Sequence, residues 1–158
     1  MKKIILALCV VILSISFLGL QTPSERDKVQ AAMEDLVTIA TGLADHIIDN
    51  GECLPNAGPI RKDGVLYKAI VPFYVINLPV KDPWGHDYLV YTREAINGQY
   101  GITGMMPDDF LVVSLGKDGV KEDWIFNPSN PKKGTSLDFN PDSDLIMLNG
   151  SWIRCPIK

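Results

Sequence analysis

Residues 24–51 read SERDKVQAAMEDLVTIATGLADHIIDNG and decide the fold. Ser24 is a favourable helix N-cap, and Glu25 and Asp27 place negative charge in the first turn, where the helix dipole favours it. Gly51 then suits the left-handed conformation that ends many helices. Between these ends, apolar residues recur at helical spacing in one stripe: Val29, Ala32, Met33, Leu36, Ile39, Ala40, Leu43 and Ile47. The stretch therefore predicts one long helix that buries this stripe in a core.

Turn-forming residues dominate the next part of the chain. Prolines at positions 55, 59, 72 and 79 exclude long helices there, although a short helical turn fits residues 67–70. Asp82-Pro83-Trp84-Gly85 has the residue order of a type I turn. We expect this region to connect the helix to a sheet.

Short strands are predicted for the second half. Asn149-Gly150 suits the two positive φ angles of a type I′ turn and so predicts a hairpin. Apolar, aromatic and β-branched residues place the strands at 88–92, 110–114, 145–148 and 151–153. One N-terminal helix followed by short strands indicates the α+β class, with the helix packed on a small antiparallel sheet and a long polar loop region at 127–144. His46, beside the apolar stripe, is expected at the helix surface or its boundary rather than on a metal.

The N-terminus carries an export signal. Lys2 and Lys3 precede an apolar run at residues 4–20, the pattern of a secretory signal peptide. The run is also just long enough to stay in the inner membrane as an anchor. Both interpretations predict an exported domain at residues 21–158, in the periplasm, at the membrane facing the periplasm, or secreted.

Charge and cysteine content fit an exported protein. Without Lys2 and Lys3, 13 basic residues face 19 acidic ones, a net charge of −6. Because phosphate neutralisation needs a basic footprint, this charge argues against nucleic acid as a partner. Cys53 and Cys155 form an even pair in an oxidising compartment and predict a disulfide; two separate buried thiols are the alternative.

Three segments in this order resemble a known family: LPVKDPWGHDY at 78–88, LVVSLGKDG at 111–119 and DSDLI at 142–146. Together with the preceding helix they resemble the major pseudopilin of type II secretion systems, over residues 24–153. The resemblance implies a pilin-like domain that polymerises into a periplasmic pseudopilus and helps to move folded proteins out of the cell. The partners that it implies are other pseudopilin or secretion-system subunits, including copies of itself.

The resemblance also implies a structural calcium ion. Carboxylates, main-chain carbonyls and a further oxygen would come from Leu115, Asp118, Val120, Asp142, Ser143 and Asp144. This oxygen-rich set matches the ligands that calcium prefers. The alternative is a solvated acidic loop in which the Asp residues only form turns.

The N-terminus departs from the family. A pseudopilin precursor has a short basic leader ending in Gly before Phe-Thr-Leu-Ile-Glu, and none of that motif stands here. The apolar run ends at Gln21-Thr22-Pro23 and is not continuous with the amphipathic helix. An exported binding module that does not assemble filaments is therefore the alternative function.

Enzyme chemistry is disfavoured by the sequence. Ser114 lacks the flanking glycines of a nucleophile elbow. His86-Asp87 follows a turn, and no oxyanion motif stands beside it. We expect a non-enzymatic protein, with a small hydrolase as the weaker alternative.

Overall fold

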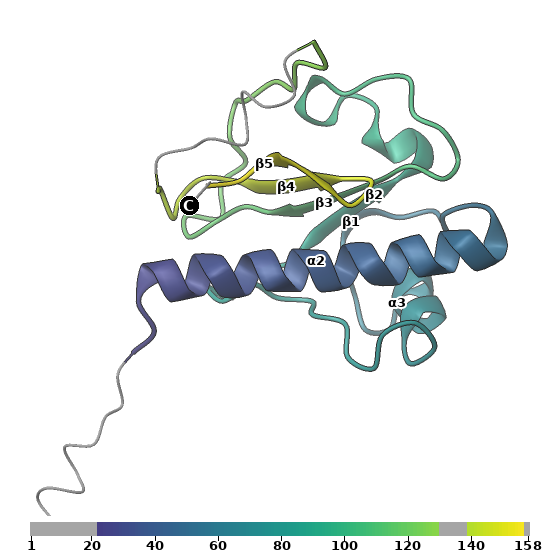
Figure 1. The fold of residues 1–158 in the computed structure, drawn as a ribbon, viewed down its shortest axis with the longest axis horizontal. Coiled ribbons are helices and arrows are strands. Elements are labelled where there is room, and N and C mark those ends of the chain that lie inside the picture. Colours follow the sequence, from purple (N-terminus) through teal and green to yellow (C-terminus); the bar gives the residue numbers. More distant parts are fainter. Residues whose placement is uncertain (1–21, 130–138, 157–158) are drawn as a thin grey trace, which may run out of the picture.

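The computed structural model describes residues 22–129 and 139–156, so the predicted leader lies outside the described residues. It has one long helix and a five-stranded antiparallel sheet, which confirms the α+β class (Figure 1). In chain order the elements are α2 (Glu25–Asn50), β1 (Ala57–Pro59), α3 (Val65–Ile70), β2 (Leu89–Thr92), the 3-10 helices η1 (Arg93–Ile96) and η2 (Gln99–Gly101), β3 (Phe110–Ser114), β4 (Leu145–Leu148) and β5 (Ser151–Arg154).

Helix α2 begins and ends where the sequence predicts. The Asp27 amide donates to the Ser24 hydroxyl at 3.2 Å, and the Ser24 amide donates to the Asp27 carboxylate at 3.0 Å, forming a capping box. At the other end, Gly51 has a φ of 81° and its N–H donates to the Ile47 carbonyl at 2.7 Å. Because both ends are satisfied locally, the helix is defined by its own sequence over 26 residues.

The sheet follows chain order, β1-β2-β3-β4-β5, and every neighbouring pair is antiparallel. All five residues of β3 are buried, because β3 is central and both faces of the sheet are covered. Its Phe110 and Val112 pack in the core under α2, whereas Leu111 and Val113 pack in a second core on the other face. The alternation of side chains along a strand produces this division.

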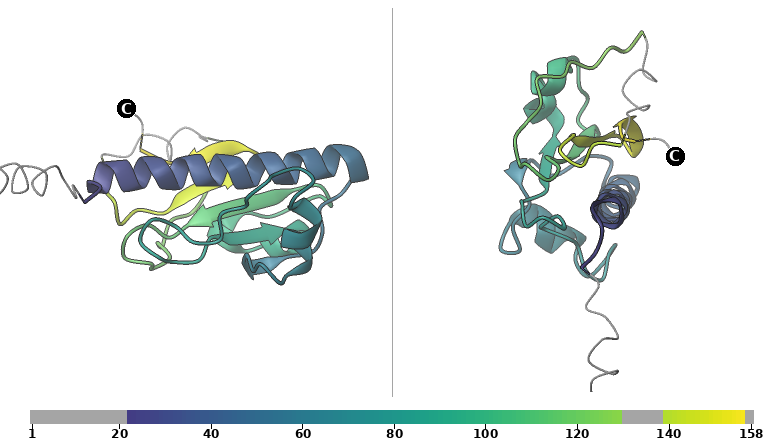
Figure 2. Two further views of the ribbon diagram at one scale, coloured as in Figure 1. Left: turned by 90° about the horizontal axis from the view of Figure 1, so that it is seen from below. Right: turned by 90° about the vertical axis from the view of Figure 1, so that its left-hand side faces the viewer.

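The molecule therefore has three layers. Helix α2 lies along one face of the sheet over β3 and β4, with α3 beside it. The opposite face is covered by η1, η2 and the irregular segment that ends near Phe126, as the right-hand view of Figure 2 shows. In residues 22–129 and 139–156, we find no helix with the length and apolar character needed to cross a bilayer.

The local predictions hold with a few corrections. The β4–β5 hairpin turns at Asn149 and Gly150, whose φ angles are 49° and 74°, as predicted. Strand β1 was not predicted, and the short helical turn at 67–70 extends to the six-residue α3. His46 is buried instead of lying at the surface, because the Tyr74 ring packs edge-on against it with centroids 5.6 Å apart.

Candidate functional site

The segments that carry the family resemblance meet at one place, which we call the turn–loop junction: residues 82–86, 114–119 and 140–144. Its centre is Asp82, which is only 5% exposed. One carboxylate oxygen of Asp82 accepts hydrogen bonds from the Trp84 amide at 3.0 Å and the His86 amide at 2.9 Å. The turn itself closes through the Gly85 amide, which donates to the Asp82 carbonyl at 2.9 Å. The Asp82 side chain thus stabilises the predicted turn by accepting hydrogen bonds from its amides.

The second carboxylate oxygen of Asp82 joins the turn to β3. The buried Ser114 hydroxyl donates to it at 3.0 Å. The His86 ring lies 3.6 Å from the same oxygen, and its Nδ1 lies 3.0 Å from the Gly116 carbonyl. Since a carbonyl only accepts, Nδ1 carries the proton in that contact. Ser114 is therefore held as a buried donor and is not presented to solvent as a nucleophile.

Two glycines let the three segments approach closely. A Cβ at Gly116 would lie 2.8 Å from the carbonyl oxygens of both Pro141 and Ser143. A Cβ at Gly119 would lie 2.7 Å from the His86 ring. Both glycines also have positive φ angles, 68° and 67°, which side-chain-bearing residues adopt at a cost. The two glycines of the SLGKDG sequence therefore allow the backbone segments to pack closely.

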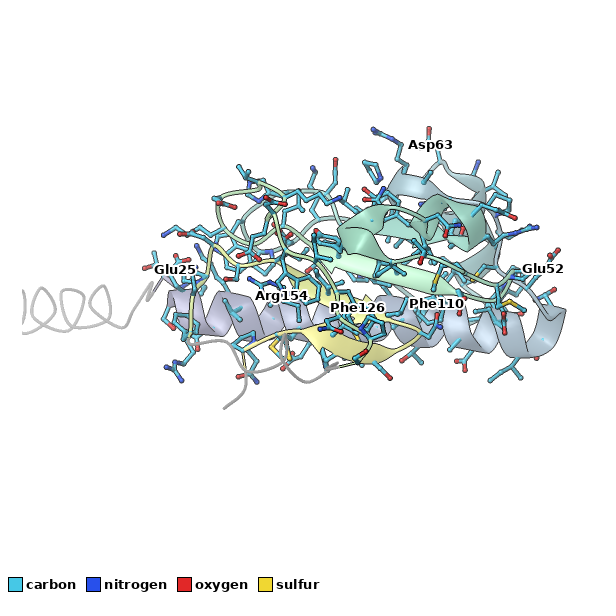
Figure 3. The ribbon with its side chains drawn as sticks, turned by 90° about the horizontal axis from the view of Figure 1, so that it is seen from above. Glu25, Glu52, Asp63, Phe110, Phe126 and Arg154 are labelled. Carbon is cyan, nitrogen blue, oxygen red and sulfur yellow. The ribbon has the colours of Figure 1, made fainter. Side chains whose placement is uncertain are left out.

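The junction also fastens the start of α2. The Trp84 indole N–H donates to the Glu25 carboxylate at 2.9 Å, and the Lys117 ammonium lies 3.9 Å from the same oxygen. The hydrogen bond from Trp84 is the main reason that the pKa of Glu25 lies below its usual value. Figure 3 shows Glu25 at one end of α2, with Glu52 just past the other end. The N-terminal end of the helix is thus tied to the turn 59 residues further along the chain.

Asp144, the last residue of the junction, lies in a buried polar cluster with Tyr100 and Glu122. One of its oxygens accepts from the Tyr100 hydroxyl at 2.6 Å and from the Glu122 amide at 3.0 Å. Glu122 in turn accepts from Arg154 at 2.6 Å, and the Arg154 guanidinium lies over the Trp124 ring. Burial raises the pKa of Asp144 to about 6. Its other oxygen, Oδ1, is buried without a hydrogen-bond partner among the described residues.

The structure does not arrange the six expected calcium ligands as a cage. Asp118 accepts from the Val120 amide at 2.9 Å, and Asp142 is exposed whereas Asp144 is fully buried. In the described part of the chain, no three His, Cys, Asp or Glu side chains group as metal ligands do. Calcium needs six to eight oxygens, and among the side chains of residues 22–129 and 139–156 only one oxygen, Asp144 Oδ1, is buried without a donor. As arranged, this donor set does not fit the ion, and calcium stays a prediction of the resemblance.

The predicted disulfide between Cys53 and Cys155 is absent, and both cysteines are buried free thiols. The Cys53 amide donates to the Pro107 carbonyl, before the start of β3, whereas Cys155 follows Arg154, next to the far end of β3. At about 3.3 Å per residue, the two positions lie roughly 20 Å apart along the sheet. A disulfide requires Cα atoms within about 7 Å. Both thiols instead fill the core under α2.

Some residues of this region had no signal in the sequence. Tyr100, Glu122 and Arg154 reach Asp144 or each other across 22 to 44 residues of chain. The sequence around each of these residues gives no sign of its role, because its partner lies on another element. Asp82 was visible as a turn residue, but its contact with Ser114 and the close approach of Gly116 to Pro141 and Ser143 were not.

These features define a class: an α+β domain in which a capped N-terminal helix is fastened along an antiparallel sheet by a buried turn–loop junction. Comparison with protein-family models, with curated protein sequences and with solved structures finds no match for this chain. The class is therefore defined by the architecture and the junction alone.

Proposed function

We propose that this chain is an exported, pilin-like structural subunit that acts in, or beside, a type II secretion or type IV pilus-like assembly. The observation that carries the proposal is the junction. The DPWG and SLGKDG segments, which resemble the major pseudopilin, hold each other through Asp82, Ser114 and His86. The same junction bonds the start of the helix through Trp84.

The direction of α2 supports a tethered subunit. The helix begins at Glu25, directly after the break that follows the apolar run at 4–20. Fastening that first turn to the sheet keeps the point at which the N-terminal segment joins the domain at a fixed place on its body. A subunit held through its N-terminus would use this end of α2 as its attachment point.

The outer surface of α2 offers a place for contacts between subunits. Val37 is 45% exposed in the middle of the helix, away from the buried stripe. Glu94 in η1 is also well exposed but lies on the opposite face of the sheet. The two positions therefore form a matched pair, one on the face expected to contact another subunit and one away from it.

Photo-crosslinking in cells tests the proposal. A photoreactive residue at Val37 should give a ladder of multiples of the chain mass, whereas the same residue at Glu94 should give a weaker ladder or none. Negative-stain microscopy of the same membranes should show filaments. A single adduct with a different protein at Val37, and no filaments, would favour the exported binding module instead.

N-terminal sequencing of the native protein distinguishes the two forms of the subunit. A start near Phe17 or Leu20 identifies a released domain, and a start at Met1 identifies an anchored one. An anchored start agrees with a subunit assembled at the inner membrane, because the apolar run then remains in the bilayer.

A further inference from the structure

Three Asn-Gly pairs stand at turns of this chain: Asn50-Gly51 at the end of α2, Asn97-Gly98 after η1 and Asn149-Gly150 between β4 and β5. An asparagine before a glycine can modify itself, because the glycine nitrogen can attack the side-chain amide carbon and no side chain obstructs it. The attack requires that this nitrogen give up its proton. The structure distinguishes the three pairs by the contacts of their amide groups.

The glycine nitrogens differ in their hydrogen bonds. The Gly51 N–H donates to the Ile47 carbonyl at 2.7 Å, and the Gly98 N–H donates to the Ile102 carbonyl at 2.8 Å. The Gly150 N–H has no acceptor among the residues that the structure describes. Attack by Gly51 or Gly98 must therefore first break a hydrogen bond, whereas attack by Gly150 need not.

The Asn149 side-chain amide is hydrogen-bonded at both of its ends. Its Oδ1 accepts from the Phe110 amide at 2.8 Å, and its Nδ2 donates to the Asp109 carboxylate. Asp109 is itself held in place, because its other oxygen accepts from the Met106 amide at 2.6 Å. An N–H at the amide oxygen stabilises the negative charge that develops there during attack, and a carboxylate at the amide nitrogen can carry a proton.

The other two asparagines lack the carboxylate. The Asn50 Nδ2 donates to a carbonyl of its own helix and to the Tyr74 hydroxyl. The Asn97 Nδ2 donates to the Glu94 carbonyl, and its Oδ1 accepts from the Gly104 amide at 3.0 Å. In the described part of the chain, neither side chain is hydrogen-bonded to a carboxylate. Of the three pairs, only the one in the hairpin turn therefore combines a free glycine nitrogen with a carboxylate.

We propose that Asn149 converts itself into aspartate and isoaspartate through attack by the Gly150 nitrogen. The Gly150 nitrogen forms a bond to Cγ of Asn149, the bond from Cγ to Nδ2 breaks, and Nδ2 leaves as ammonia with the Gly150 proton. Asp109 carries that proton to the leaving nitrogen, while the Phe110 N–H stabilises the charge on Oδ1. Water then opens the cyclic imide at either carbonyl, which yields aspartate or isoaspartate. This inference goes beyond the proposed function and does not depend on it.

The hairpin turn is open to water and can rearrange. Asn149, Gly150 and Ser151 are all exposed, and Figure 1 shows the turn at the tip of the yellow hairpin, whose strand β5 ends the sheet. Ring closure requires the Asn149 backbone to rotate out of the turn conformation, in which its φ is 49°. Such local opening costs least at exposed turns with few buried contacts.

The products weaken the contacts from which the reaction starts. An aspartate at position 149 replaces the donor to Asp109 with a second carboxylate, so that two negative charges face each other. Isoaspartate adds a methylene to the main chain of the two-residue turn, which no longer matches the twist of the strands. The modification therefore loosens the tip of the β4–β5 hairpin, and it is irreversible because the ammonia is lost.

Mass spectrometry of the full chain tests the proposal. Folded protein and guanidinium-unfolded protein are incubated at neutral pH and digested at intervals, and the fraction of each asparagine converted to the acid is measured. Dividing the folded rate by the unfolded rate at each site removes the effect of local sequence. We expect this ratio to be roughly two- to tenfold higher at Asn149 than at Asn50 or Asn97, the factor that one hydrogen bond on the glycine nitrogen contributes. A ratio at Asn149 equal to or below either of the others would overturn the proposal.

Asp109→Asn tests the part of the carboxylate. The substitution keeps an oxygen that can accept from Asn149 but cannot carry a proton, so the rate at Asn149 in the folded protein should fall. The rate is expressed relative to that at Asn97, which cancels a general loosening of the fold because loosening raises both. Asp108→Asn is the matched control, since it removes the neighbouring exposed carboxylate and should leave this relative rate unchanged. Equal relative rates in D109N and D108N would remove Asp109 from the reaction.

Discussion

Replacing Asp82 with alanine should destabilise the domain more than any other single carboxylate change at the junction. The substitution removes the acceptor for the Trp84 amide, the His86 amide and the Ser114 hydroxyl. A hydrogen bond to a charged group contributes about 1.5–3 kcal/mol. The two amides lie in a partly exposed turn and can donate hydrogen bonds to water instead, but the Ser114 hydroxyl is fully buried. We therefore expect a loss of about 3–5 kcal/mol, out of the 5–15 kcal/mol typical of a domain.

Urea unfolding followed by tryptophan fluorescence measures this loss. With an m-value of about 2 kcal/mol/M, the midpoint of D82A should fall by about 2 M. Asp87→Ala is the matched control, because Asp87 pairs with Lys81 at the surface and should contribute less than about 1 kcal/mol. Asp82→Asn keeps an acceptor oxygen and should fall between the two. Equal losses in D82A and D87A would refute the role assigned to Asp82.

Four further outcomes follow from the structure. Gly116→Ala should lose at least about 2 kcal/mol more than Gly98→Ala in the same urea assay, since both have positive φ but only Gly116 faces carbonyl oxygens at 2.8 Å; equal losses would remove the packing argument. Burial raises the pKa of Asp35. The stability that protonated Asp35 contributes to the folded state is therefore full below about pH 4 and is lost as the pH rises through the folded pKa. The unfolding free energy of wild type minus that of Asp35→Asn should therefore fall as the pH rises above about 4, and a flat difference would contradict the shift. Under non-reducing denaturation, a maleimide should label both Cys53 and Cys155, whereas an unlabelled pair would reveal a disulfide. For calcium, the resemblance predicts a higher melting temperature with calcium than with a chelator, and identical curves would remove the ion.

Elements defined by local chemistry could be predicted from the sequence. Ser24 and Gly51 satisfy the ends of α2 with groups a few residues away, so its bounds need no tertiary information. Asn149 and Gly150 define the β4–β5 turn in the same way. The apolar strand β3 could be recognised because a central strand buries both faces and so lacks alternation.

Elements held by distant partners could not be predicted. Strand β1 reads Ala-Gly-Pro, which has little strand propensity, and Pro59 cannot donate to a ladder. Its pairing is supported from outside, because the Asn56 side chain donates to the Val90 carbonyl at 2.6 Å and the Asn56 backbone amide donates to the Thr92 hydroxyl at 2.8 Å. The disulfide prediction failed for a related reason, since an even number of cysteines says nothing of the distance between them.

The type of the residues at the junction does not by itself decide whether it binds calcium. The resemblance assigns Asp118 and Asp144 to the ion, and each accepts a hydrogen bond from the chain itself, from the Val120 amide and the Tyr100 hydroxyl respectively. Each hydrogen bond uses one oxygen of its carboxylate, so it does not by itself prevent coordination through the other oxygen. Asp144 Oδ1 is buried without a donor among the described residues, whereas the Asp142 carboxylate is exposed. Whether the junction binds calcium therefore depends on whether six to eight oxygens can converge on one point, and the number of acidic residues in the loop does not decide it.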